Sequence, residues 1–143
     1  MEAQSEKIKN QITEAFAQVR YPGDKHIAYH QDCLECDRVR ADFRGQSPTT
    51  LEKDVIEWHH DSLPLLSPKA YHFFLPAYLF QALDDAHSGV TEMLLYSLDS
   101  TEKKRLKLFN KDQKEAIRSF LNWLQSVNEY RDEEVENARK IWI

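Results

Sequence analysis

The sequence predicts an all-α fold, a single compact orthogonal or irregular bundle of about six to seven helices that spans residues 1–143. Two observations carry this prediction. The chain has only three glycines and five prolines, and they fall where helices would start, stop or bend, unlike the regular turns of a sandwich or barrel. Apolar residues make up 41% of the chain, enough to offset the ordering entropy of one domain of this length. We therefore expect one helical domain.

Apolar stripes predict the first two helices. The first stripe recurs at helical spacing and ends at Pro22 and Gly23; it consists of Ile8, Ile12, Phe16 and Val19. The second helix is expected to begin at Asp32, whose carboxylate would cap it while Glu35 reaches back as in a capping box. It should end at Gly45, and its inward face carries Cys36, Val39 and Phe43.

A third helix is predicted after Thr49, because Thr49 and Glu52 repeat the capping-box spacing. Its apolar stripe is Leu51, Val55 and Trp58. The segment from His59 to Leu66 then interrupts the helical pattern.

The fourth helix is predicted to be long and central. Ser67 is a good N-cap and Pro68 suits the first helical position, where the amide hydrogen that it lacks has no partner. Pro76 deletes a backbone hydrogen bond inside the helix, which predicts a kink there, and Gly89 should mark the end. Apolar residues cover much of its circumference: Tyr71, Phe74, Leu75, Tyr78, Leu79, Ala82 and Leu83.

Three further helices complete the predicted bundle. The apolar run Met93 to Leu98 is assigned to a helix because its neighbours are helical. Asn110 or Asp112 is expected to cap the next helix, which faces inward with Ile117, Phe120, Leu121 and Leu124. Val135, Ala138, Ile141 and Trp142 outline the last helix, whose tryptophan must dock on the domain or face a partner.

Charge and hydropathy exclude several classes of function. The net charge is −5, with nine basic and sixteen acidic residues before position 101 and a local excess of four positive charges over residues 101–118. A nucleic-acid binder usually has a basic footprint, so the acidic balance disfavours that class. No stretch approaches the length of a membrane span and nothing resembles a signal peptide. With two cysteines only, the sequence predicts a cytoplasmic protein.

Three segments resemble a family of small, functionally uncharacterised bacterial proteins over roughly residues 12–125. They are His30-x-x-Cys33-x-Glu35-Cys36-Asp37, Phe43-x-Gly45, and the run from Leu63 to Leu79 with its Leu-Ser-Pro-x-Ala-Tyr-x-Phe-x-Leu-Pro-Ala core. The resemblance implies a helical fold and no particular activity.

Cys33 and Cys36 are the first candidates for chemistry, and three interpretations remain open. At the start of a helix, unpaired amides and the helix dipole favour a thiolate, as in redox Cys-x-x-Cys proteins, although no βαβ pattern precedes the pair here. Zinc is the second interpretation, with a ligand set drawn from His30, Cys33, Cys36, His59 and His60, and Asp61 as a further ligand. In the third, Cys36 is only a small buried side chain on the core stripe.

For two other groups a structural explanation is favoured over a functional one. His59, His60 and Asp61 suggest acid–base catalysis, but no nucleophile elbow, phosphate loop or His-Glu-x-x-His motif accompanies them, and a solvated helix end explains them. The basic run could bind anions, but a solvated helical face is the better interpretation; it comprises Lys103, Lys104, Arg105, Lys107, Lys111 and Lys114.

The sequence therefore favours a non-catalytic protein-interaction module without a cofactor, whose acidic surface binds a basic protein. Small size and acidity suggest a bacterial immunity protein that neutralises a toxin. The alternative is a zinc-binding protein, structural or hydrolytic, that uses Cys33, Cys36 and nearby histidines.

Overall fold

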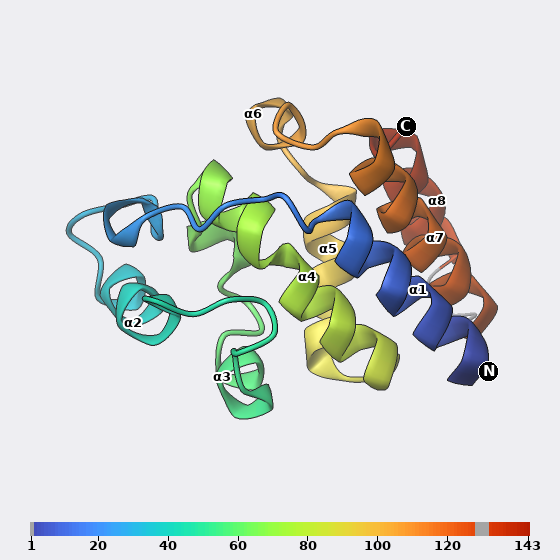
Figure 1. The fold of residues 1–143 in the computed structure, drawn as a ribbon, viewed down its shortest axis with the longest axis horizontal. Coiled ribbons are helices and arrows are strands. Elements are labelled where there is room, and N and C mark those ends of the chain that lie inside the picture. Colours follow the sequence, from blue (N-terminus) through green and yellow to red (C-terminus); the bar gives the residue numbers. More distant parts are fainter. Residues whose placement is uncertain (1, 128–131) are drawn as a thin grey trace.

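The computed structural model describes residues 2–127 and 132–143, and it confirms the all-α prediction (Figure 1). In this part of the chain eight α-helices and two short 3-10 helices occur without a strand; Ala28 and Leu66 form an isolated bridge. The elements are α1 (Glu2–Ala15), η1 (Asp24–His26), α2 (Leu34–Phe43), α3 (Lys53–Trp58), η2 (Leu63–Leu65), α4 (Pro68–Asp84), α5 (Gly89–Asp99), α6 (Lys103–Leu106), α7 (Lys111–Val127) and α8 (Asp132–Ile141).

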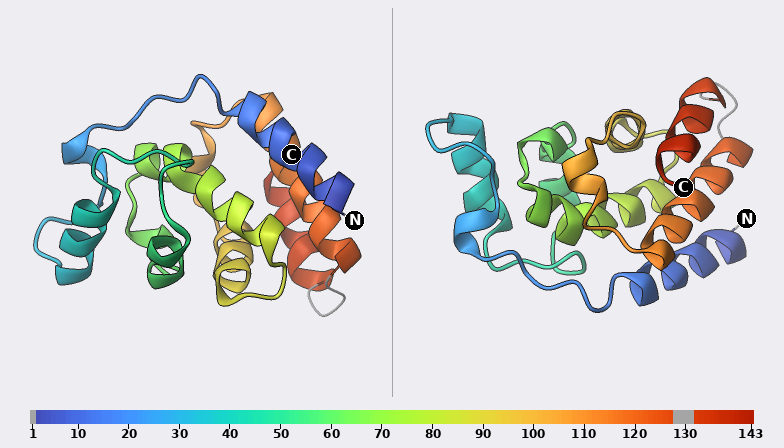
Figure 2. Two further views of the ribbon diagram at one scale, coloured as in Figure 1. Left: turned by 60° about the horizontal axis from the view of Figure 1, so that its bottom comes forward. Right: turned by 90° about the horizontal axis from the view of Figure 1, so that it is seen from above.

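The helices form an elongated bundle around α4. Helices α2 and α3 lie at one end, and α1, α7 and α8 pack together at the other, where both termini also lie (Figure 2). Helix α5 packs on both α4 and α8, so it links the middle of the bundle to that second end. None of the helices in the described part of the chain is long and apolar enough to span a lipid bilayer.

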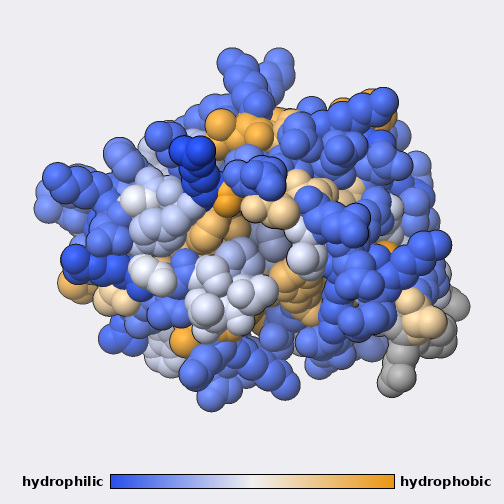
Figure 3. Space-filling view, viewed as in Figure 1, coloured by the Kyte–Doolittle hydropathy of each residue, from blue (hydrophilic) through white to orange (hydrophobic). Residues whose placement is uncertain are grey.

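The predicted apolar stripes account for most of the core. Ile8, Ile12 and Phe16 are buried, and every apolar residue predicted to face inward from α4 is buried as well. Trp142 docks on the domain: its indole Nε1 donates to the Leu98 carbonyl at 3.0 Å. On the face shown in Figure 3, hydrophilic side chains cover most of the surface and apolar ones gather toward the middle, around α4.

Helix α4 begins as predicted and ends earlier than predicted. The Ser67 hydroxyl accepts a hydrogen bond from the Ala70 amide at 3.1 Å, and Pro68 is the first helical residue. Pro76 lies inside the helix and is buried. The helix ends at Asp84, so the prediction that Gly89 ends it was wrong. Gly89 instead begins α5, because Ser88 caps that helix by accepting from the Thr91 amide at 3.3 Å.

The N-termini of α2 and α3 also differ from the predictions. Cys33, not Asp32, is the N-cap of α2: it has extended dihedral angles and its sulfur accepts from the Cys36 amide at 3.1 Å. Thr49 does not cap α3, which starts at Lys53 after a turn in which the Thr50 amide donates to the Ser47 carbonyl. Before α3 the Thr50 hydroxyl accepts from the Ser47 amide at 2.7 Å, which stabilises a turn there in place of an earlier helix start.

Helix α6 was not among the helices predicted individually, although the basic run that contains it was assigned to a solvated helical face. It carries a buried cation. Lys103, Lys104 and Lys107 are exposed, which fits a solvated face, but Arg105 points inward and is only 7% exposed. Its guanidinium donates to the carbonyls of Leu63, Pro64 and Leu66 at 3.1, 3.0 and 2.8 Å. Arg105 therefore fixes η2, the segment that follows the candidate site.

Candidate functional site

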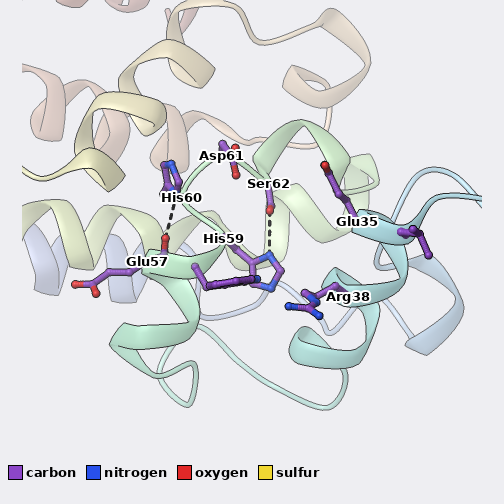
Figure 4. A pocket seen from close by; sticks show the side chains of 9 residues that line it. Glu35, Arg38, Glu57, His59, His60, Asp61 and Ser62 are labelled. Carbon is purple, nitrogen blue, oxygen red and sulfur yellow. Dashed lines mark hydrogen bonds between the residues drawn. The ribbon is translucent and has the colours of Figure 1, made fainter.

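A groove of about 650 Å³ lies at the α2–α3 end of the molecule. Helix α2 provides one wall, and the end of α3 with the turn after it provides the other. Figure 4 shows Glu35 and Arg38 on the α2 side, Glu57 and His60 on the opposite side, and His59 with Ser62 between them. The full lining is Leu34, Glu35, Arg38, Glu57, Trp58, His59, His60, Asp61 and Ser62.

Two large apolar side chains of the groove are in contact with solvent. Leu34 is 89% exposed and Trp58 is 63% exposed. The Arg38 guanidinium carbon lies 5.4 Å from the centroid of the Trp58 ring, within the range of a cation–π contact. The prediction that Trp58 belongs to the core stripe of the third helix was therefore wrong. Ile56 is buried instead, because this helix has only six residues and its rotation is set by the turns that flank it.

Carboxylates outnumber cations in the groove. Its lining contains Glu35, Glu57 and Asp61 against the single permanent cation of Arg38. Glu57 also forms an ion pair with Lys53 at 3.8 Å, whereas Glu35 and Asp61 have no salt bridge within residues 2–127 and 132–143. The groove therefore presents negative charge next to exposed apolar surface.

The buried side chain of His59 connects the two walls. Its Nε2 lies 2.7 Å from Oδ2 of Asp42 on α2, and its Nδ1 lies 2.9 Å from Oγ of Ser62. Since the carboxylate only accepts, we assign the ring proton to Nε2, so that the Ser62 hydroxyl donates to Nδ1. The Phe43 ring packs against the imidazole nearly at right angles, with 5.2 Å between the two ring centroids.

Tyr78 on α4 stabilises the same turn through a hydrogen bond. Its hydroxyl donates to the His59 carbonyl at 2.8 Å, and burial raises the pKa of Tyr78 well above its usual value, with Asp61 adding to the effect. The phenol therefore stays protonated and keeps donating over the whole physiological range.

Serine, histidine and carboxylate also form the relays of hydrolases, but the geometry here is that of a structural link. Ser62 is only 7% exposed. Its backbone amide donates to the His59 carbonyl at 3.0 Å, so that amide is engaged and cannot stabilise an oxyanion. The acid–base interpretation of the His59, His60 and Asp61 cluster gains no support from this arrangement.

The residues of the zinc interpretation do not come together. His30 is exposed, and both ring nitrogens of His59 are occupied by Asp42 and Ser62. His60 uses Nδ1 in a contact of 3.0 Å with the Glu57 carbonyl. Across the described residues, no three side chains of His, Cys, Asp or Glu gather where they could hold a metal ion.

Cys33 and Cys36 do lie next to each other, at the N-terminus of α2. Cys33 is half-buried and caps the helix, while Cys36 is fully buried beneath it. Burial raises the pKa of the Cys36 thiol, and a hydrogen bond with Cys33 raises it further. Both cysteines are free thiols.

These observations define a class, an all-α protein with an acidic groove that exposes a tryptophan. The chain belongs to a family of unknown function (DUF6714), whose model matches residues 4–143. The match confirms the resemblance to a functionally uncharacterised helical family, and it is longer than the expected residues 12–125. No curated protein and no solved structure matches the chain.

Proposed function

We propose that the protein is a non-catalytic interaction module, and that its α2–α3 groove binds a segment of a basic partner protein. The observation that carries this proposal is the 63% exposure of Trp58 at the edge of the groove. Covering a large aromatic side chain that is in contact with water lowers the free energy of the complex. Tryptophan is also among the residues that contribute most to protein interfaces.

Leu34 and Trp58 are the exposed apolar side chains of the groove that a partner could cover. Leu34 and Trp58 would each contribute about 2 kcal/mol if the partner covered them fully. The groove walls are held in place before binding, because His59 links α2 to the turn after α3. Such preorganisation lowers the entropy cost of association.

Charge selects the kind of partner. Glu35, Glu57 and Asp61 line the same groove as Leu34 and Trp58, and the chain as a whole carries a net charge of −5. Complementary charge speeds the encounter and disfavours acidic competitors. The partner segment is therefore expected to carry lysine or arginine next to a leucine or an aromatic residue.

Toxin neutralisation by an immunity protein is the narrower form of this proposal. It is supported by the small size of the chain and by its acidic balance. Identifying a basic toxin encoded beside this protein, and measuring its inhibition by the purified chain, would test that role.

A selection from a random peptide display library tests the groove itself. The immobilised protein should enrich peptides in which basic residues flank an apolar anchor. Recovery of acidic peptides, or of no common motif, would contradict the proposal.

Variants that remove charge then test whether an enriched peptide binds in the groove. The double variant Glu35→Gln and Asp61→Asn should bind more weakly and with a smaller dependence on salt. The matched control is Glu115→Gln with Glu134→Gln, which removes the same charge from exposed positions on α7 and α8. Equal weakening by both pairs would show that only net charge matters and that the groove is not the site.

A further inference from the structure

Cys33 and Cys36 are arranged asymmetrically at the start of α2. Cys33 is the N-cap, half-buried, and its sulfur accepts the Cys36 amide at 3.1 Å. Cys36 is 0% exposed, and its thiol is hydrogen-bonded to Cys33. Cys33 is thus partly exposed to solvent, and Cys36 is held behind it within hydrogen-bonding distance.

The position of Cys33 makes it the more accessible of the two cysteines. It precedes the first helical residue of α2, a helix of ten residues, and it is half-buried, whereas Cys36 is buried. The Cys36 amide already points at the sulfur. Cys36, in contrast, is kept protonated by its burial, which raises the pKa of its thiol. Cys33 is therefore the cysteine that a reagent in solution can reach, and Cys36 lies buried behind it.

We propose that Cys33 and Cys36 form a reversible redox pair, with Cys33 as the attacking thiol and Cys36 as the resolving thiol. The oxidant is a low-molecular-weight disulfide. The Cys33 thiolate attacks one sulfur of that disulfide, which forms a mixed disulfide and releases the other half as a thiolate. Cys36 gives its proton to the released thiolate and attacks the Cys33 sulfur. This breaks the mixed disulfide and expels the second half as a thiolate, which takes up the proton that Cys33 had lost to solvent.

The net change balances. Two protein thiols become one Cys33–Cys36 disulfide, and the oxidant becomes two small thiols, with two electrons passing from the protein to the oxidant. An excess of small thiol reverses both steps. The redox interpretation of Cys-x-x-Cys was weakened by the lack of a βαβ pattern, but the chemistry requires only the helix start, the accessible first sulfur and the buried second sulfur.

Equilibration of the reduced wild-type protein with glutathione at graded ratios of disulfide to thiol tests the proposal. Samples are quenched with acid and alkylated, and the mass of the intact protein is measured by mass spectrometry. The expected product at oxidising ratios is a monomer that lacks two hydrogens and takes up no alkylating reagent, and it should disappear again at reducing ratios. Two alkylated cysteines at every ratio, or a glutathione adduct that never closes, would overturn it.

Two variants test the assigned order and serve as controls for each other. Cys36→Ala should accumulate glutathione on Cys33, because the resolving thiol is missing. Cys33→Ala should stay unmodified, because Cys36 is fully buried. Equal modification of the two variants, with both folded by circular dichroism, would contradict the order. The wild-type experiment remains decisive if either variant fails to fold.

Discussion

Nε2 of His59 lies 2.7 Å from Oδ2 of Asp42, and this contact joins the two walls of the groove. Asp42 belongs to α2, and His59 follows the last residue of α3. The other ring nitrogen reaches Ser62, so that a single side chain spans from one helix to the turn after the other. The shape of the groove therefore depends on a buried imidazole that does not itself offer a free nitrogen to a ligand.

Replacing His59 should be far more destabilising than replacing its neighbour. His59→Ala leaves a cavity and removes both hydrogen bonds, and we expect a loss of about 3 kcal/mol in the free energy of unfolding. His60→Ala removes a contact at the groove surface and should change it by less than about 0.5 kcal/mol. Urea denaturation measures both values. Similar losses in the two variants would show that the link has no special role.

Arg105 gives a second stability test, outside the groove. Arg105→Met removes the donor of the Pro64 and Leu66 carbonyls and leaves the Leu63 carbonyl with the Leu66 amide alone, and we expect a loss of about 3 kcal/mol in the free energy of unfolding. Lys103→Met removes an exposed charge from the same helix and should be nearly neutral. Comparable urea midpoints for the two variants would contradict the structural role of Arg105.

Alkaline pH should destabilise the protein through Tyr78. Burial raises the pKa of Tyr78 above the ordinary 10.0, so the folded state keeps a proton that the unfolded state releases. This contribution to stability is fully present below pH 10 and falls as pH rises toward the folded-state pKa. Burial raises the pKa of Tyr71 as well, so Tyr71 contributes to the same loss of stability at alkaline pH.

The variant Tyr78→Phe separates this effect from the hydrogen bond. It should lose about 1 kcal/mol near neutral pH, because its donation to the His59 carbonyl is gone. Its stability should then fall less steeply with alkaline pH than that of the wild type. Urea unfolding at a series of pH values on both sides of 10 gives the two curves. Parallel curves would mean that Tyr78 does not titrate differently on folding.

Metal removal should have little effect on stability. A zinc ion bound by Cys33, Cys36, His59 and a second histidine would require His59 to give up its contact with either Asp42 or Ser62. We expect protein purified without a histidine tag to keep its thermal midpoint when a chelator is added. A stoichiometric zinc content by elemental analysis, lost in Cys33→Ser with Cys36→Ser, would revive the zinc alternative.

The long helices could be predicted from the sequence because periodicity and capping agree there. Ser67, Pro68 and the apolar positions of α4 point to the same start and the same buried face. Asn110 also caps α7 as one of the two expected residues, by accepting from the Gln113 amide at 2.8 Å. Where several local signals agree, they are enough to predict where a helix begins and which face is buried, without knowledge of the tertiary contacts.

The groove could not be predicted, because it depends on short elements. In α3 the six residues make less than two turns, so a stripe of three apolar positions does not establish which face is buried, and Trp58 was assigned to the core. Arg105 lies in a run of lysines, and nothing in its local sequence distinguishes the one buried cation from its exposed neighbours. The partners of Arg105 are about forty residues away, beyond the reach of local patterns.

Titration of one selected basic peptide into Trp58→Ala and Tyr96→Ala tests the central claim most directly. Both variants remove an aromatic side chain of nearly equal exposure, 63% for Trp58 and 64% for Tyr96, but only Trp58 lies in the groove. We predict that Trp58→Ala weakens binding at least about tenfold and that Tyr96→Ala binds like the wild type. Equal affinity in the two variants would contradict the assignment of the α2–α3 groove as the binding site.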